Sequence, residues 1–305
     1  MARGADASGG QRPLAGILWM LLTGANFVAV TALVKHVGDA VPAPQAAFLR
    51  YLLGLVFLAP MLGPLLRAGI DRRGLAQYSV RGLVHALGVI CWFYAMTRIP
   101  IAEVTAMNYL NPVYVTIGAA LVFGERLALR RILAIAVAFA GVLVILRPGF
   151  RELSDGHLAM IFTALFFGAS YLMAKRLSER DSAAVVVAML SLTVTLALAP
   201  LALAVWVTPT LSQLFWLFLV AFFATAGHYS MTMAFRAAPL AVTQPVTFLQ
   251  LVWATLLGWL VFDEAADGWV ILGGAMIVAA VVFISWREAT LKRRVTTPPP
   301  EATKL

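Results

Sequence analysis

The chain has 305 residues, of which 62% are hydrophobic and only 12% are charged. Soluble domains carry about twice that share of charged residues, so the composition excludes a disordered chain and argues against a water-soluble enzyme. The single cysteine, Cys91, excludes an internal disulfide and a cysteine-based metal cluster, and we expect no cofactor. The net charge of +9 is distributed as membrane topology requires, so we expect no nucleic-acid partner.

Ten apolar stretches have about the length of membrane-spanning helices, which need about 20 residues. They do not alternate between polar and apolar residues as the strands of a membrane barrel do. The predicted fold class is therefore an all-α integral membrane protein with ten transmembrane helices. The predicted spans are Leu14–Val34, Ala43–Leu66, Leu75–Thr97, Ile101–Phe123, Ile132–Leu146, Leu158–Ala174, Ala183–Val207, Leu214–Phe235, Leu240–Phe262 and Trp269–Trp286.

Lysine and arginine in the loops predict the orientation, because cytoplasmic loops of membrane proteins carry the excess of positive charge. If the N-terminus lies inside, the outer loops hold only Lys35, Arg98, Arg147 and Arg151. We therefore predict a multi-pass protein of the bacterial inner membrane, with residues 1–13 and 287–305 as cytoplasmic tails. The first apolar run is too long for a cleaved signal peptide, and Lys292–Leu305 resembles a disordered end.

The two halves of the chain resemble each other at a shift of about 140 residues. Three of the matched pairs are not easily produced by chance: Pro60 with Pro200, Pro100 with Pro239, and Glu125 with Glu264. This predicts two repeats, residues 14–147 and 148–286, with five spans each. Because five is odd, the second repeat is inverted in the membrane. Inverted repeats are common in secondary transporters, whose substrate site lies near the midplane between the repeats.

The stretch Tyr94–Leu127, YAMTRIPIAEVTAMNYLNPVYVTIGAALVFGERL, combines a proline before an Ala-rich helix, a mid-helix proline and a closing Gly-Glu pair. Together with Phe48–Arg50 in the second span, it resembles the EamA family of the drug/metabolite transporter superfamily. Asp263 and Leu251 depart from this pattern in the second half. The resemblance implies ten helices and transport of a small organic metabolite, such as an amino acid, a nucleobase, a cofactor precursor like riboflavin, or S-adenosylmethionine. A broad-range exporter of toxic compounds is the alternative.

Polar side chains inside a span are expensive in lipid, so they usually face the bundle interior or a cavity. Asn108 and Asn111 are three residues apart and share one face of their helix. The repeat places Thr247 and Gln250 on the matching face of the ninth span. We expect these four side chains to form the core of a substrate-binding cavity. The alternative is that they bond neighbouring helices together, at about 0.6–2 kcal/mol for each hydrogen bond.

Six further residues are predicted to bind substrate from their places in the spans: Asn26, Ser170, His85, Trp92, His228 and Tyr229. His85 and Trp92 share one face of the third span with Arg81, which we expect to extend its charge to the inner surface. The aromatic rings could stack on an aromatic or cationic solute. Packing inside the bundle, or anchoring at the membrane interface, is the alternative for each of these residues.

Five residues are predicted to act as gates or structural elements: Arg50, Glu103, Pro112, Glu125 and Glu264. Arg50 is a charge inside the second span, where it either neutralises an anionic group of the substrate or pairs with Glu103 or helix carbonyls. Pro112 removes a backbone donor and predicts a kink or hinge. Glu125 and Glu264 lie at matching helix ends on opposite membrane faces, where we expect them to pair with arginines or helix N-termini.

Motifs of other classes of membrane protein do not occur in the sequence. HExxH, GxSxG and GxxxxGK[ST] are missing, so we expect neither an enzyme nor an ATP-driven pump, and an intramembrane enzyme is a remote alternative. We expect a permease that carries a small-molecule substrate through the lipid bilayer by alternating access. Proton coupling would have to use Glu103, His85 or His228. The sequence leaves coupling, the direction of transport and a homodimer open.

Overall fold

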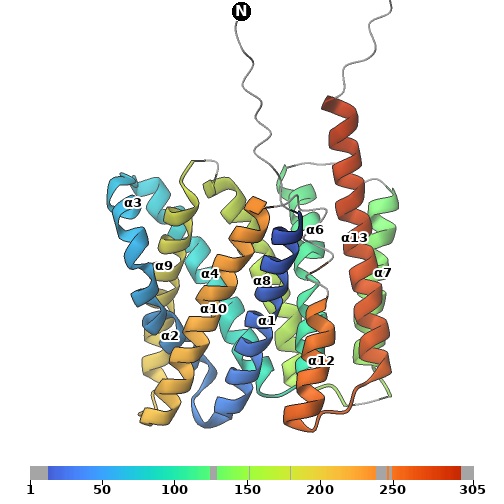
Figure 1. Ribbon diagram of the computed structural model, residues 1–305, viewed down its shortest axis with the longest axis horizontal. Coiled ribbons are helices and arrows are strands. Elements are labelled where there is room, and N and C mark those ends of the chain that lie inside the picture. The colour runs from blue at the N-terminus through green and yellow to red at the C-terminus, as the bar shows by residue number, and fades with distance from the viewer. Residues whose placement is uncertain are drawn as a thin grey trace, which may run out of the picture.

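The computed structural model describes residues 13–123, 129–150, 152–178, 180–237, 246 and 249–296, and most of these residues are helical (Figure 1). The α-helices are α1 (Pro13–Val37), α2 (Ala43–Gly54), α3 (Leu62–Arg67), α4 (Arg72–Met96), α5 (Ile101–Asn108), α6 (Asn111–Phe123), α7 (Leu129–Leu146), α8 (Asp155–Ser178), α9 (Ala183–Ala204), α10 (Leu211–Ala237), α12 (Leu249–Phe262) and α13 (Gly268–Thr296). Two 3-10 helices are η1 (Gly38–Ala40) and η2 (Leu55–Met61).

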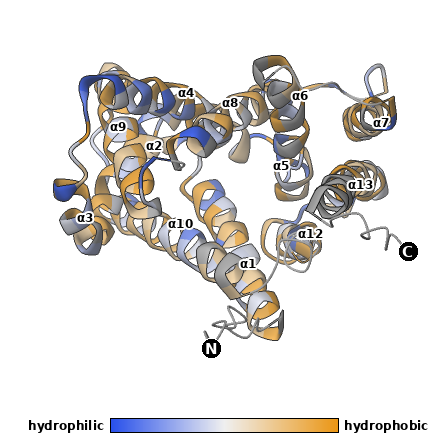
Figure 2. Ribbon diagram, turned by 90° about the horizontal axis from the view of Figure 1, so that it is seen from above, coloured by the Kyte–Doolittle hydropathy of each residue, from blue (hydrophilic) through white to orange (hydrophobic). Residues whose placement is uncertain are grey.

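Six helices of the described part are long and apolar enough to cross a membrane. They cover Leu14–Ala40, Ala43–Pro60, Arg72–Met96, Asp155–Ala174, Ala184–Ala204 and Leu211–Met231. Shorter apolar helices cover Ile132–Leu146, Leu249–Phe262 and Gly268–Ile284. Figure 2 shows hydrophobic residues on the outer sides of the bundle as well. A water-soluble protein carries more polar residues on its outer surface. The protein is therefore an all-helical, multi-pass membrane protein, as its composition predicts.

The second predicted span is not one continuous α-helix. α2 ends at Gly54, the tighter η2 follows, and α3 begins at Leu62. Pro60 lies inside η2 and has no N–H, so it cannot bond to the carbonyl four residues earlier as an α-helix requires. The continuous helix expected over Ala43–Leu66 is therefore wrong, although Ala43–Pro60 remains long and apolar enough to span.

The fourth predicted span is broken near its middle. α5 ends at Asn108 and α6 begins at Asn111, with Tyr109 and Leu110 in a turn between them. Pro112 has no N–H to give to the carbonyl of Asn108, four positions earlier. The kink predicted at this proline is thus a full break of the helix. Breaks of this kind persist inside membranes where the freed backbone lines a cavity or is covered by protein.

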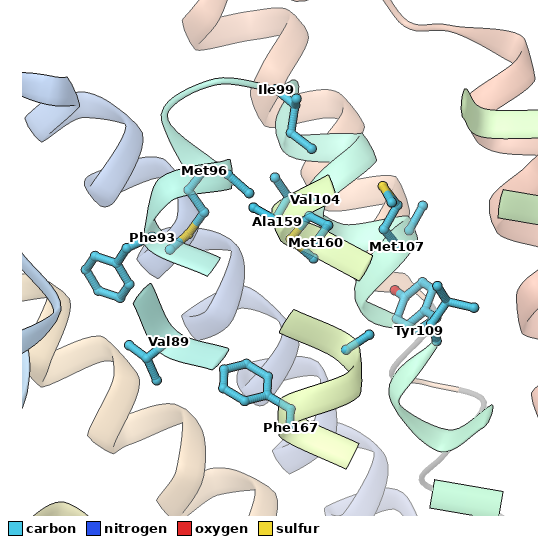
Figure 3. Packing of buried hydrophobic residues seen from close by; sticks show 14 of the residues in the cluster. Val89, Phe93, Met96, Ile99, Val104, Met107, Tyr109, Ala159, Met160 and Phe167 are labelled. Atoms are coloured by element: carbon cyan, nitrogen blue, oxygen red, sulfur yellow. The ribbon is translucent and has the colours of Figure 1, made fainter. Parts of the chain in front are cut away.

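Three pairs of helices pack along each other: α1 with α10, α4 with α8, and α7 with α13. Figures 1 and 2 show α7 and α13 side by side at one end of the bundle and α2, α3 and α9 at the other. Part of the main hydrophobic core lies where α4, α5 and α8 meet. Figure 3 shows Phe93, Met96, Val104, Met107 and Met160 in this core. Close packing of these large side chains fixes the three helices relative to one another.

The last helix continues beyond the predicted span. α13 runs from Gly268 to Thr296, past the end expected at Trp286. Its final turns hold alanine, leucine, lysine and arginine, which all favour helix. The expectation that Lys292–Leu305 is disordered throughout is therefore wrong for the residues up to Thr296.

Glycines bring α7 and α13 into close contact. Gly141 faces Gly273, and a Cβ atom on Gly141 would lie 2.6 Å from the carbonyl oxygen of Gly273. The same Cβ atom would lie 2.9 Å from Cγ1 of Ile277. Cβ atoms do not approach backbone this closely, so the contact requires glycine. Small residues commonly allow such approaches between membrane helices.

We predict that Gly141→Ala lowers the thermal unfolding midpoint of the detergent-purified protein, because α7 and α13 must separate to admit the methyl group. The expected cost of overpacking is about 1–3 kcal/mol, partly offset by the higher helix propensity of alanine. Gly268→Ala is the matched control, since a Cβ atom there meets nothing within 4 Å. Equal midpoints for the two variants would contradict this packing.

Candidate functional site

The break between α5 and α6 carries two asparagines that the sequence predicts for the cavity. The side-chain amide of Asn111 donates to Oδ1 of Asn108 at 2.9 Å, so the two side chains lie together, as their spacing indicates. Asn111 is 7% exposed, and its own Oδ1 atom is buried without a hydrogen-bond partner. A buried acceptor without a partner costs about 1–3 kcal/mol. A solute that donated a hydrogen bond to this atom would recover that cost.

The matching residues of the second half lie at the start of α12. Gln250 packs on α1, where its Cγ atom would lie 3.4 Å from a Cβ atom on Gly24. The Tyr109 hydroxyl, from the turn between α5 and α6, lies within hydrogen-bonding reach of the Leu251 backbone. The broken fourth span therefore packs beside the start of α12. Thr247, the remaining member of the predicted core, lies outside the described residues.

A second polar group lies where α2, α4 and α8 meet. One ring nitrogen of His85 is 3.1 Å from the Tyr51 hydroxyl, and the other is 3.1 Å from the Ser170 hydroxyl. The ring stacks on Phe167, with the two centroids 4.7 Å apart. Both nitrogens of this buried histidine therefore have partners. His85 connects three helices and holds the Tyr51 hydroxyl in place.

Arg50 lies beside this group without a counter-ion. Its guanidinium carbon is 4.2 Å from the ring centroid of Tyr51, and the residue is 8% exposed. Its Nε atom is buried without a hydrogen-bond partner, and the described part of the chain supplies no ion pair. Arg50 lies within electrostatic reach of His85 and His228. A charge left in lipid costs at least about 2.5 kcal/mol, so an anionic partner would stabilise this arginine.

Two further side chains belong to this polar group: Tyr171 lies within electrostatic reach of Tyr51, and His228 lies within electrostatic reach of Arg50. Tyr171 is 44% exposed, and His228 is exposed as well. His228 contacts Phe27 of α1 edge to face, with the ring centroids 5.2 Å apart. We call Arg50, Tyr51, His85, Tyr171 and His228 the central cluster.

The other residues predicted to bind substrate lie at different distances from this cluster. Trp92 contacts Phe167, the ring that stacks on the cluster, and its Nε1 atom is buried without a partner. Asn26 is buried and donates to a carbonyl oxygen of its own helix at 2.7 Å. Tyr229 is exposed and packs edge to face on Trp19 of α1. Trp92 is thus the member of this group with a polar atom available beside the cluster.

Glu264 joins helices at one end of the bundle. One carboxylate oxygen pairs with Lys35 of α1, and the other accepts the backbone N–H of Ile101, at the start of α5, at 2.9 Å. Lys35 also donates to the carbonyl oxygen of Ile99 at 3.1 Å. The side chains of Lys35 and Glu264 are 20% and 12% exposed, so the pair is largely shielded. Glu125, the counterpart of Glu264 in the first half, lies outside the described residues.

Further ion pairs lie at the same end. Glu103, in the first turn of α5, bonds to His157, in the first turn of α8, at 2.6 Å, and both side chains are buried. The pairing of Arg50 with Glu103 that the sequence allowed is therefore wrong, because the carboxylate is held at the helix end by the histidine. Arg147, at the end of α7, pairs with Asp267 just before α13. These contacts join α5 with α8 and α7 with α13 at this end of the bundle.

The opposite end has polar contacts of its own. Asp71 pairs with Arg180 at 2.7 Å and caps α4 by accepting the Gly74 N–H at 2.8 Å, and these two hydrogen bonds lower the pKa of Asp71. Arg81 is 5% exposed and donates to the carbonyl oxygen of Val186 at 3.1 Å. The expectation that Arg81 extends to the membrane surface is therefore wrong, because a carbonyl of α9 holds it inside the bundle.

Two members of the central cluster, Tyr51 and Tyr171, were not among the residues predicted from the sequence. Each directly follows a predicted residue, Arg50 or Ser170, and therefore faces another side of an ideal helix. A tyrosine inside a span is itself a signal, because its buried hydroxyl needs a hydrogen-bond partner. That signal does not say which helix supplies the partner, and the packing of α2, α4 and α8 decides it here.

Comparison with known proteins agrees with this architecture. The model of the EamA-like transporter family matches residues 14–147 and 154–286. A riboflavin transporter of Rhizobium johnstonii is 31% identical over 286 residues, which are 93% of this chain and 95% of the relative. The pseudopaline exporter CntI of Pseudomonas aeruginosa is 27% identical, over 88% of this chain and 95% of the relative. An S-adenosylmethionine uptake transporter of Rickettsia prowazekii is 24% identical, over 90% and 94%.

A solved crystal structure shares the fold, with a TM-score of 0.56 at 23% identity, over 90% of this chain and 97% of that one. The fold and these relatives define the class of the protein, a multi-pass membrane transporter of small metabolites. The chain belongs to the EamA-like transporter family, within the drug/metabolite transporter superfamily.

We predict that Lys35 and Glu264 stabilise the fold jointly. Lys35→Met and Glu264→Gln should each lower stability, and the double variant should lose less stability than the sum of the two single losses, with a coupling energy of about 0.5–3 kcal/mol. Unfolding in detergent would measure this double-mutant cycle. The exposed pair Arg98–Asp39, 3.0 Å apart, is the control and should couple by less than about 1 kcal/mol. Additive effects at Lys35 and Glu264 would contradict a joint role.

Proposed function

We propose that this protein is a secondary transporter that carries a small organic metabolite across the bacterial inner membrane by alternating access, with both termini in the cytoplasm. Its family and its relatives are transporters. The single observation that carries the proposal is the central cluster, in which polar and charged side chains gather inside an apolar bundle. Polar groups at membrane depth are a mark of solute pathways.

Ten spans arranged as two inverted halves are part of this proposal. The repeat relates α1 to α8 and α4 to α10, so a two-fold axis would turn the contact of α1 with α10 into that of α8 with α4. Both contacts are among the most extensive in the protein. The same axis would relate α7 to α13 and α2 to α9, which also pack on each other. The pattern of helix contacts therefore supports inverted repeats.

The ion pairs at the helix ends serve as gates in this proposal. Positive-inside topology places Lys35, Glu264, Glu103 and His157 at the outer side, where their bonds join α1, α5, α8 and α12. The structure would then be closed to the outside. Opening that side requires the bonds of Glu264 to Lys35 and Ile101 to break while the halves move about the central cluster.

We predict saturable exchange of solute by the purified protein in lipid vesicles. Vesicles loaded with unlabelled riboflavin, S-adenosylmethionine or an amino acid should take up the same labelled solute faster than empty vesicles, because a carrier exchanges solute during its cycle. These probes are chosen from the substrates named for the relatives and from solutes that could bond to the amide side chains predicted for the cavity. Chemical turnover of the solute would indicate an enzyme instead. A lack of counterflow for every solute, including toxic compounds, would contradict the proposal.

We predict that alanine at Asn108, Asn111, Thr247 or Gln250 weakens transport. Loss of one hydrogen bond to solute should cost about 1–2 kcal/mol, or roughly 5- to 30-fold in half-saturation concentration or rate. Thr195→Ala is the control, because that hydroxyl bonds to a carbonyl oxygen of its own helix. If the fourfold alanine variant keeps wild-type transport kinetics, these residues do not form the cavity core.

Proton coupling is a companion proposal, for which the buried pair of Glu103 and His157 is the best-placed titratable group. Collapse of an imposed proton gradient should slow net solute uptake by the wild type. Glu103→Gln should keep solute exchange and lose the dependence on the gradient. Uptake by the wild type that ignores the gradient would remove this proposal and leave the carrier itself intact.

A further inference from the structure

We infer that Arg50 binds the carboxylate group of the transported solute, so that the substrate is a small organic acid or an amino-acid-like compound. This inference rests on the proposed function and names the chemistry of its substrate. It is carried by the state of Arg50, which is buried against the Tyr51 ring and has neither an ion pair nor an acceptor for its Nε atom in the described part of the chain.

No acidic residue of the described chain forms an ion pair with Arg50, and apart from Glu288 in α13 these residues lie at helix ends and in loops. Most of them are bonded there: Asp39 to Arg98, Asp71 to Arg180, Asp181 to Tyr78, Glu103 to His157, Glu264 to Lys35 and Asp267 to Arg147. A positive charge without such a partner in a bundle of low polarity is best neutralised by an anion that comes from outside. In a transporter that anion is the solute.

Tyr51 orients Arg50 for a planar ligand. A guanidinium above an aromatic ring keeps its N–H edge free in its own plane. The N–H groups along that edge can then donate in parallel to both oxygens of a carboxylate. The Tyr51 hydroxyl is held by His85, and His85 is held by Ser170. Tyr51 is therefore a positioning residue, and Arg50 is the group that touches the solute.

The single charge of Arg50 favours a carboxylate over a phosphate. A carboxylate carries one negative charge, whereas a phosphate monoester carries about −1.5 to −2 at pH 7 and would leave negative charge uncompensated. Arg81, the other buried arginine of the region, donates to the neutral carbonyl oxygen of Val186, and its Nε atom also lacks a partner. A neutral nucleobase or flavin would bring no counter-charge to Arg50.

Thermal stabilisation of the detergent-purified protein tests the inference without relying on flux. The probes are pairs that differ in the acid group: S-adenosylmethionine with its decarboxylated analogue, and tryptophan with tryptamine. Flavin mononucleotide with riboflavin forms the phosphate arm. We expect the carboxylate member of a bound pair to bind about 10- to 100-fold more tightly than its amine. Arg50→Gln should bring the two members to equal affinity.

Two further variants keep the test decisive. Arg50→Lys retains the positive charge and loses the parallel N–H donors of the guanidinium, so its preference for the carboxylate should be intermediate. This variant replaces Arg50→Gln in the test if Arg50→Gln does not fold. Arg98→Gln makes the same change at an exposed pair and should keep the wild-type preference. Equal binding of both members by the wild type, binding of neither member of any pair, or a preference that survives Arg50→Gln would overturn the inference.

The outcomes also separate this inference from the proposed function. A preference for flavin mononucleotide over riboflavin that Arg50→Gln removes would overturn the carboxylate in favour of phosphate. Carboxylate binding through Arg50 without solute exchange in vesicles would refute the proposed transport, and the inference that Arg50 binds a carboxylate would stand. Exchange of neutral solutes at equal rates by the wild type and Arg50→Gln would refute the inference about Arg50, and the proposed transport function would stand.

Discussion

A positive charge inside an apolar helix bundle is the constraint on which the rest of this structure depends. Such a charge is expensive in lipid, so the protein must surround it with groups that reduce the cost. Tyr51 supplies a ring face to Arg50, His85 holds the tyrosine, and Ser170 holds the histidine. Three helices that are distant in sequence are thereby connected to one guanidinium. A solute that supplied a negative charge to this guanidinium would complete the site.

The ends of the bundle and its centre satisfy their polar groups in different ways. At one end Glu264 and Glu103 are fully engaged with Lys35, Ile101 and His157. In the centre, single atoms remain without partners: Nε of Arg50, Nε1 of Trp92 and Oδ1 of Asn111. A carrier benefits from both arrangements. Bonds at the ends can be exchanged when its halves move, and unpartnered atoms in the centre favour the solute-bound state.

Hydropathy and the internal repeat predict most of this fold, because lipid imposes length and polarity on every span. They do not predict where a span breaks: Pro60 and Pro112 look alike in the sequence, yet one lies in a 3-10 segment and the other follows a turn. The site is harder to predict. Arg50 and His85 are visible as polar residues in apolar runs, whereas their partners Tyr51 and Ser170 follow from helix packing. Hydropathy suggests that the Arg81 side chain extends to the membrane surface, whereas in the structure it donates to a carbonyl oxygen of α9 and is buried.

Water access to Tyr171 tests most directly the claim that a solute site lies inside the bundle. Tyr171 and Phe162 are 44% and 50% exposed, and their spacing places them on opposite sides of α8. With Cys91 replaced by serine, Tyr171→Cys should react with a charged, water-soluble thiol reagent, because a thiolate forms only in water. Phe162→Cys should face lipid and stay unreactive. Equal reactivity of the two cysteines, or an inert cysteine at 171, would contradict this account.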